Sequence, residues 1–139
     1  MPRGEGEGMA KRILIVEDSP MNMELVVDLL EHAGYVVLQA VSAEEALPLA
    51  SSEKPDLVLM DIALPGMDGL EATRQLHKDA ATRDIPIVAL TASAMLADED
   101  RAFQAGCRGI IRKPIDTRVF TRLVAGYLEA ASAGAAAEG

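Results

Sequence analysis

Short apolar runs alternate along this chain with stretches whose apolar residues recur at helical spacing. Each run is long enough for one short strand buried on both faces, and each ends in polar or turn-forming residues. The predicted strands cover residues 13–16, 35–40, 57–60, 87–90 and 109–112. The long gaps between them leave room for a helix after each strand.

Helix signals follow the strands in turn. Ser19 offers an N-terminal cap with Pro20 behind it, and Ser42 with Glu45 forms a capping box for the second helix. Pro48 is expected to bend or loosen that second helix, because proline lacks a backbone donor. The third and fourth helices are predicted over about residues 70–78 and 98–105. A last helix is capped by Asp116 and carries one apolar stripe, made of Val119, Phe120, Leu123, Val124, Tyr127 and Leu128.

This alternation of five strands and five helices indicates an α/β fold. The sheet should be parallel and doubly wound, with right-handed crossovers and helices on both faces. A common strand order for such a sheet is 2-1-3-4-5, with ligands bound beyond the carboxyl ends of the strands. Residues 1–10 are Gly-rich and charged, and residues 130–139 are almost all Ala, Gly, Ser and Glu, so neither end can bury much surface and we expect flexible tails around one domain over residues 11–129.

Composition narrows the classes of function. The 139 residues suffice for a single core, and 13 Lys and Arg against 22 Asp and Glu give a net charge of −9, which argues against direct contact with nucleic acid. Cys107 is the sole cysteine, so a reducing compartment fits best. No apolar stretch reaches the roughly 18 residues of a membrane span. We therefore expect a cytoplasmic protein without membrane contact.

Polar residues interrupt the apolar runs where strands finish. Glu17 and Asp18 follow the first strand, Asp61 the third, Thr91 the fourth and Lys113 the fifth. In the order 2-1-3-4-5 the first and third strands are neighbours, about 4.8 Å apart. The three carboxylates should therefore be crowded together, with the hydroxyl and the ammonium group reaching in from one side.

Carboxylates this close repel one another unless a cation lies among them. All the ligands on offer are hard oxygens, which favours Mg²⁺, with Mn²⁺ as a substitute. Magnesium keeps open positions for water or a phosphoryl oxygen. For phosphoryl transfer, Asp61 is the central nucleophile that would form an acyl phosphate, while Lys113 would hold a phosphoryl oxygen and Thr91 would donate a hydrogen bond.

The same residues match a known family. The chain from residue 12 to about residue 128 resembles the receiver domain of two-component response regulators, which has a flavodoxin-like fold. The resemblance is carried by ILIVED at residues 13–18, LMDI at 59–62, LPGMDG at 64–69, LTA at 90–92 and KP at 113–114.

The resemblance implies a role for each site residue. Asp61 would be the phosphoacceptor and a metal ligand, Asp18 a direct magnesium ligand, Glu17 a ligand through a metal-bound water, and the Ala63 carbonyl the last protein ligand. Thr91 would be the switch hydroxyl. In the same way, Lys113 would be the phosphoryl-binding lysine, joined to Pro114 by a cis peptide bond.

One position departs from the family pattern. The family often has an aromatic residue three positions before the lysine, where this chain has Ile110. We expect Thr91 still to move toward the phosphoryl group, with Ile110 or the loop after the fourth strand repacking behind it.

These observations predict a stand-alone response regulator. It would accept a phosphoryl group from a phosphohistidine of a histidine kinase or histidine phosphotransfer protein, and would signal by partner binding or phosphorelay. It would be no enzyme beyond catalysing its own phosphorylation and dephosphorylation. The resemblance places the partner contact on the fourth helix, fifth strand and fifth helix, and we expect a monomer or a weak dimer. The basic residues expected on this face are Arg101, Arg112, Arg118 and Arg122.

Four alternatives stay open. The chain resembles receivers of hybrid histidine kinases through residues 17–22, and a pseudo-receiver would bind a partner without phosphorylation. A magnesium-dependent phosphatase would normally carry a second acid where Ala63 stands, and a flavin-binding domain would need a Ser-, Thr- and Gly-rich loop after the first strand. His32 and His77 lie away from the strand ends, so we expect no catalytic or metal role for either.

Overall fold

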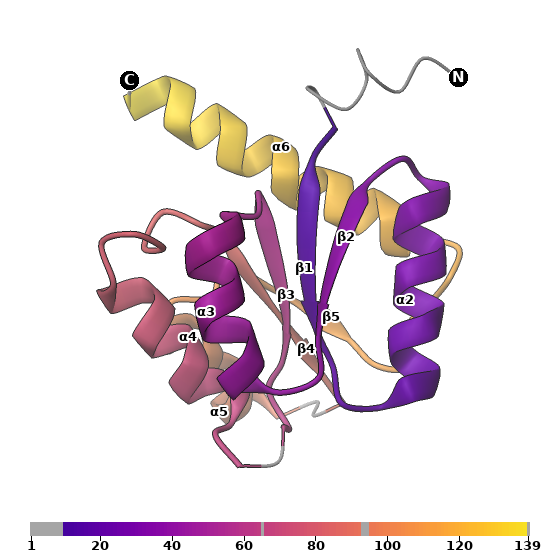
Figure 1. Cartoon of the computed structure of the whole chain (residues 1–139), viewed down its shortest axis with the longest axis horizontal. Helices are drawn as coiled ribbons and strands as arrows, with labels where there is room; N and C mark the ends of the chain where they lie inside the picture. Colours follow the sequence, from indigo (N-terminus) through magenta and orange to yellow (C-terminus); the bar gives the residue numbers. More distant parts are fainter. Residues whose placement is uncertain (1–9, 65, 93–94, 139) are drawn as a thin grey trace.

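A single parallel sheet forms the centre of the molecule. The computed structural model describes residues 10–64, 66–92 and 95–138. Pro65 and all but the last residue of the expected N-terminal tail therefore lie outside the described residues. The strands stand in the order β2-β1-β3-β4-β5 (Figure 1), which confirms the expected topology. Their bounds are β1 (Arg12–Val16), β2 (Val36–Ala40), β3 (Leu57–Asp61), β4 (Ile87–Thr91) and β5 (Gly109–Arg112).

Helices cover both faces of this sheet. One face packs against α2 (Pro20–His32) and α6 (Phe120–Glu138), and the other against α3 (Ala43–Glu53), α4 (Gly69–Lys78) and α5 (Leu96–Ala105). Alternation along the strands divides the core accordingly. In β1, for example, Ile13 and Ile15 contact the first helix layer, and Leu14 and Val16 the second. Both faces are apolar, so the strands appear in the sequence as unbroken apolar runs.

The predicted caps are present. The Ser19 hydroxyl accepts a hydrogen bond from the Asn22 N–H at 3.3 Å, and the Ser42 hydroxyl accepts one from Glu45 at 3.1 Å. The Glu45 carboxylate in turn accepts from the Val41 N–H at 3.1 Å, one residue earlier than in the usual capping box. The second of these helices, α3, continues through Pro48 to Glu53, so the proline does not end it.

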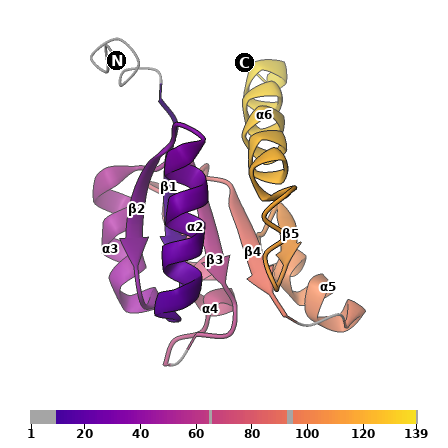
Figure 2. The ribbon, with the colours of Figure 1, turned by 90° about the vertical axis from the view of Figure 1, so that its right-hand side faces the viewer.

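The last helix differs from its expected bounds at both ends. Asp116 accepts a backbone hydrogen bond from Phe120 at 3.0 Å, but a turn intervenes and α6 begins only at Phe120. Residues 130–138, expected as a tail, continue the helix, because alanine is the strongest helix former. Figures 1 and 2 show this end extending past the sheet. The apolar stripe is also narrower than expected, since Leu123 is 41% exposed.

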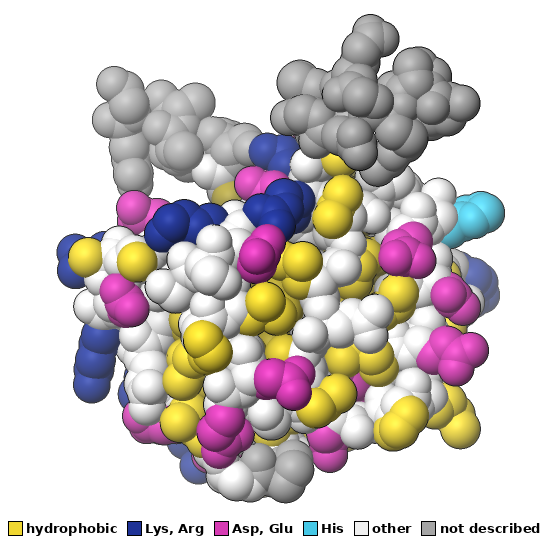
Figure 3. Space-filling view, viewed as in Figure 1, with side chains coloured by type: hydrophobic (Ala, Val, Ile, Leu, Met, Phe, Trp, Pro, Cys, Tyr) yellow, Lys and Arg dark blue, Asp and Glu magenta, His cyan; other side chains and the backbone are white. Residues whose placement is uncertain are grey.

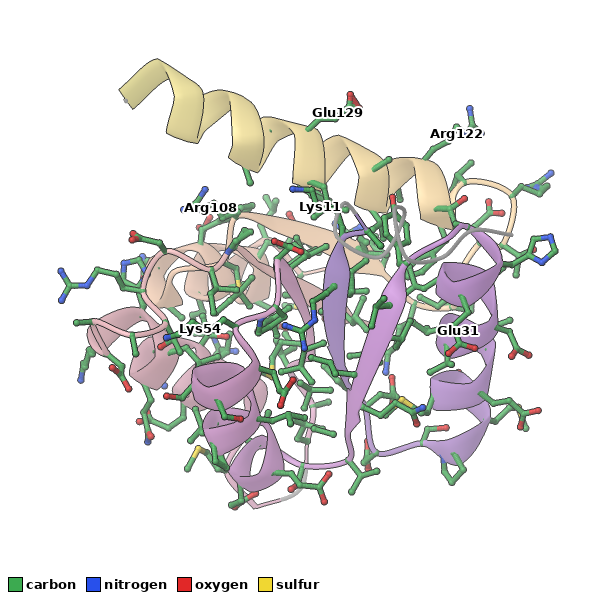
Figure 4. All side chains as sticks on the ribbon, turned by 45° about the horizontal axis from the view of Figure 1, so that its top comes forward. Lys11, Glu31, Lys54, Arg108, Arg122 and Glu129 are labelled. Atoms are coloured by element: carbon green, nitrogen blue, oxygen red, sulfur yellow. The ribbon has the colours of Figure 1, made fainter. Side chains whose placement is uncertain are left out.

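Several cations lie at the amino ends of the strands. Lys11 and Arg108 directly precede β1 and β5, and Lys54 lies shortly before β3, so these cations gather at the amino ends of the strands (Figure 4). On the face turned to the viewer in Figure 3, most Lys and Arg side chains lie toward the upper and left margins, while Asp and Glu side chains are spread over it. Among the described residues, no helix has the length and apolarity that crossing a bilayer requires.

The single cysteine tests how tightly this core is closed. Cys107 is 5% exposed, and burial raises the pKa of its thiol from 9.0 to about 11. At pH 8 we expect iodoacetamide to label the native protein about 100-fold more slowly than the urea-unfolded protein, because the thiolate is scarcer and shielded. Because the folded thiol holds its proton more tightly than the unfolded one, the free energy of unfolding should fall as the pH rises from about 9 toward about 11. Labelling is measured by intact mass. Equal labelling rates for the native and the urea-unfolded protein would contradict the burial of Cys107.

Candidate functional site

The polar residues predicted at strand ends meet at the carboxyl edge of the sheet. Glu17 and Asp18 follow β1, Asp61 is the last residue of β3, and Lys113 follows β5. The pairing of β1 with β3 brings the acids onto neighbouring strands. Carboxylate oxygens of Glu17, Asp18 and Asp61 lie within 4.8 Å of one another. The expected crowding of three carboxylates is therefore present.

Two of the three acids are buried. Glu17 is 1% exposed and Asp61 3%, whereas Asp18 is open to solvent. Backbone N–H groups fix one oxygen of each buried carboxylate: Ser19 donates to Glu17 at 3.0 Å, and Ala63 donates to Asp61 at 2.9 Å. The local chain thus orients both side chains before any ligand binds.

Lys113 bridges the two buried acids. Its Nζ lies 2.8 Å from Glu17 Oε1 and donates a hydrogen bond to Asp61 Oδ2 at 3.0 Å. The backbone N–H of Lys113 also donates to the Thr91 carbonyl at 2.8 Å, so the chain beyond β5 stays attached to the end of β4. The ammonium group is thereby held between Glu17 and Asp61, two of the three acids of the cluster.

The electrostatics of the cluster favour a further cation. Burial raises the pKa of Glu17, and the Lys113 ammonium and the Ser19 N–H only partly offset this effect. Burial alone would lower the pKa of Lys113, but the carboxylates of Glu17 and Asp61 outweigh it and the net shift is upward. When all three acids are ionised, the one lysine leaves the cluster with excess negative charge.

A magnesium ion fits this donor set. The three side chains offer carboxylate oxygens only, and the exposed Asp18 gives access from solvent. A divalent ion would neutralise the excess charge that Lys113 leaves. The contribution of the Ala63 carbonyl and the substitution of Mn²⁺ stay predictions.

The remaining predicted site residues lie on β4, on β5 and just after β5. Thr91 ends β4 and is 5% exposed, and Ile110 lies half-buried in β5 beside Ala89. The Lys113–Pro114 peptide bond is cis. The movement of Thr91 and the repacking of Ile110 stay predictions, because a single conformation is described.

Two residues with contacts along the segment from β3 to α4 were missed in the sequence. Gly69 begins α4, and a Cβ there would collide with the Asp61 carbonyl and lie 2.7 Å from the Ile62 Cα. A glycine just after the capping Asp68 was the available signal. The other residue is Glu44, whose carboxylate accepts a hydrogen bond from the Met67 N–H. It gave no signal, because this contact joins segments far apart in the chain.

The fold and site together define a class of protein. The parallel sheet carries an acidic cluster and a lysine at its carboxyl edge, and a model of the response regulator receiver domain matches residues 13–125. The chain belongs to the response regulator receiver family.

Individual relatives indicate which kind of receiver protein this chain is similar to. The polar-differentiation response regulator DivK of Brucella ovis is 47% identical over 120 residues, which cover 86% of this chain and 98% of that protein. The DivK protein of Brucella anthropi is 46% identical over the same length.

Solved structures of receiver domains are similar to this chain. The receiver domain of the sensor histidine kinase PA1611 from Pseudomonas aeruginosa PAO1, with a magnesium ion coordinated in its active site cleft, has a TM-score of 0.80 at 32% identity, covering 86% of this chain and 98% of that one. A CheY-like receiver domain protein from Methanospirillum hungatei JF-1 has a TM-score of 0.83 at 30% identity, covering 90% and 98%. The chain is thus similar both to stand-alone regulators and to kinase-borne receivers.

Proposed function

We propose that this protein is a DivK-like, single-domain response regulator that accepts a phosphoryl group on Asp61. The carrying observation is the position of that carboxylate at the end of the central strand β3, buried among two acids and one lysine. Glu17 and Asp18, with Asp61, would hold Mg²⁺, which would neutralise charge on the phosphoryl oxygens. The DivK relatives are more similar in sequence to this chain, at 47% identity, than the kinase-borne receiver domain of PA1611, at 32%. This difference favours a stand-alone regulator over a hybrid-kinase receiver.

The chemistry of the proposed step is a displacement at phosphorus. An Asp61 carboxylate oxygen attacks the phosphorus of a phosphohistidine, a new O–P bond forms, and the P–N bond breaks as the imidazole leaves with its electron pair and takes up a proton. Lys113 already contacts Asp61 Oδ2, so its ammonium group is within reach of the incoming phosphoryl oxygens. Thr91 would supply a hydroxyl hydrogen bond on the same side.

The phosphorylated form would act by binding a partner rather than on an external substrate. Large apolar side chains are exposed on α5 and α6, where Leu96 is 75%, Phe103 50% and Leu123 41% exposed. Ile110 of β5 lies between these helices in the sequence and is half-buried. The face formed by α5, β5 and α6 is the proposed contact site for a downstream protein partner in the cytoplasm. The phosphoryl donor would be a separate protein, a histidine kinase or a histidine phosphotransfer protein.

Phosphorylation of Asp61 is tested directly by intact mass. With Mg²⁺ and acetyl phosphate we expect the wild type to gain one phosphoryl group, and Asp61→Asn to gain none, because the amide is no nucleophile. Chelator should abolish the gain in the wild type. Asp84→Asn, which alters an exposed acid before β4, is the matched control and should be phosphorylated normally.

The outcome discriminates between the remaining functions. A gain that persists in Asp61→Asn would reject the assignment of the phosphoacceptor. No gain from acetyl phosphate or from a phosphorylated kinase would reject the proposal in favour of a pseudo-receiver. Steady release of phosphate from small phosphate esters would instead indicate a phosphatase.

A further inference from the structure

Glu44 reaches from one helix to the segment that leads into another. It lies in the first turn of α3, and its Oε2 accepts a hydrogen bond from the backbone N–H of Met67 at 3.2 Å. The amino-terminal end of α3 lies beside the connection between β3 and α4 (Figure 1). A side chain from a separate part of the chain thus holds the backbone just before α4.

Gly66 leaves room for this carboxylate. Its φ of +75° is a left-handed conformation that favours glycine, and a Cβ at this position would lie 3.1 Å from Glu44 Oε2. Any larger residue would therefore be strained in its backbone and would push against the carboxylate. The glycine thus lets the loop pass close to the Glu44 carboxylate.

A short path leads from this contact to the phosphoacceptor. Asp68 follows Met67 and caps α4 by accepting a hydrogen bond from the Glu71 N–H at 2.8 Å. Gly69 comes next and packs directly against the backbone of Asp61 and Ile62. The Gly69 carbonyl is itself fixed by the Thr73 hydroxyl at 2.7 Å. Displacement at Met67 would consequently alter the support of Asp61.

We propose that Glu44 is a positioning residue for phosphorylation at Asp61. By holding Met67, it keeps the amino-terminal end of α4 pressed against the carboxyl end of β3. Glu44 contacts the backbone of the loop and acts on the reaction only through it. The inference rests on the proposed function of Asp61.

Three variants test this role. Glu44→Ala removes the acceptor, Glu44→Gln keeps an acceptor oxygen without the charge, and Glu45→Ala removes the neighbouring carboxylate, which bonds to Val41 instead. The readouts are amide hydrogen exchange of Met67 in the metal-free protein, followed by NMR, and the initial rate of magnesium-dependent phosphorylation by acetyl phosphate.

For Glu44→Ala we expect Met67 to exchange about tenfold faster and the phosphorylation rate to fall about 3- to 10-fold, the range of one lost hydrogen bond. Glu44→Gln should stay within about twofold of the wild type in both readouts. Glu45→Ala should leave both unchanged.

Several results would overturn the inference: wild-type behaviour of Glu44→Ala, an equal loss in Glu45→Ala, or failure of Glu44→Gln to restore exchange and rate. The proposed function fails separately. If the wild type takes up no phosphoryl group, the function is rejected, whereas unchanged Met67 exchange in Glu44→Ala rejects the positioning role alone.

Discussion

Replacing Gly69 with alanine should both destabilise the protein and slow phosphorylation. The added Cβ would meet the Asp61 carbonyl and the Ile62 Cα, which are backbone atoms that no side-chain rotation can move aside. Relief therefore requires a shift of α4 away from β3, in a core that is close-packed. We expect the free energy of unfolding to fall by about 1–3 kcal/mol, the usual cost of overpacking. The phosphorylation rate should fall about tenfold or more, as misplaced reacting groups lose rate steeply.

Gly126 provides the matched control. It lies inside α6, where an added Cβ meets nothing within 4 Å. Gly126→Ala should raise the free energy of unfolding by about 0.5–1 kcal/mol, because alanine favours the helix, and should leave phosphorylation unchanged. Urea unfolding and intact mass measure both quantities. Equal effects of the two substitutions would contradict the close approach at Gly69.

Removing the Lys113 ammonium should make the protein depend on magnesium for stability. Lys113→Met keeps most of the side-chain volume but leaves the buried carboxylates of Glu17 and Asp61 without their shared cation. We expect a loss of about 2–4 kcal/mol in chelator, near the cost of breaking a buried ion pair. Mg²⁺ should restore much of it, and it should bind about tenfold more tightly than to the wild type, since one competing positive charge is gone.

Lys54→Met is the control for this substitution. Lys54 is exposed, and its Nζ donates to the Ala81 carbonyl at 3.2 Å, away from the acids. Its removal should change the free energy of unfolding by less than about 0.5 kcal/mol and leave the magnesium response unchanged. Thermal unfolding with and without Mg²⁺ compares the three proteins. A Lys113→Met protein that behaves like Lys54→Met would show that the ion pairs contribute nothing.

The sequence was sufficient for features that depend on local pattern. The apolar run before Asp61 predicts β3 because a strand covered on both faces has little choice of residues. In a parallel sheet the carboxyl ends of all strands lie at the same edge, and the strand order makes β1 and β3 neighbours. These two facts bring Glu17, Asp18 and Asp61 together without knowledge of any side-chain conformation. Ser19 and Ser42 were equally readable, because capping is decided within one turn.

Features that depend on tertiary contacts were not predictable in this way. The simultaneous contact of Lys113 with two acids requires the conformation of a long side chain, and the Glu44 contact joins segments with no pattern in common. The exposure of Leu123 follows from how α6 is rotated against the sheet, which helical spacing alone does not set. The length of α6 was underestimated because small residues were interpreted as a tail, although alanine also stabilises helices.

The hydrogen bond from the Lys113 N–H to the Thr91 carbonyl has a mechanical consequence. The Thr91 hydroxyl and the Lys113 ammonium group, which would both bind a phosphoryl group, lie on two chain segments. The backbone hydrogen bond joins these segments with an N···O distance of 2.8 Å. Neither segment can move alone without breaking that hydrogen bond. We therefore expect a movement of Thr91 toward a phosphoryl group to displace Lys113 and the chain that leads to α6 with it, so that the hydroxyl and the ammonium group shift together.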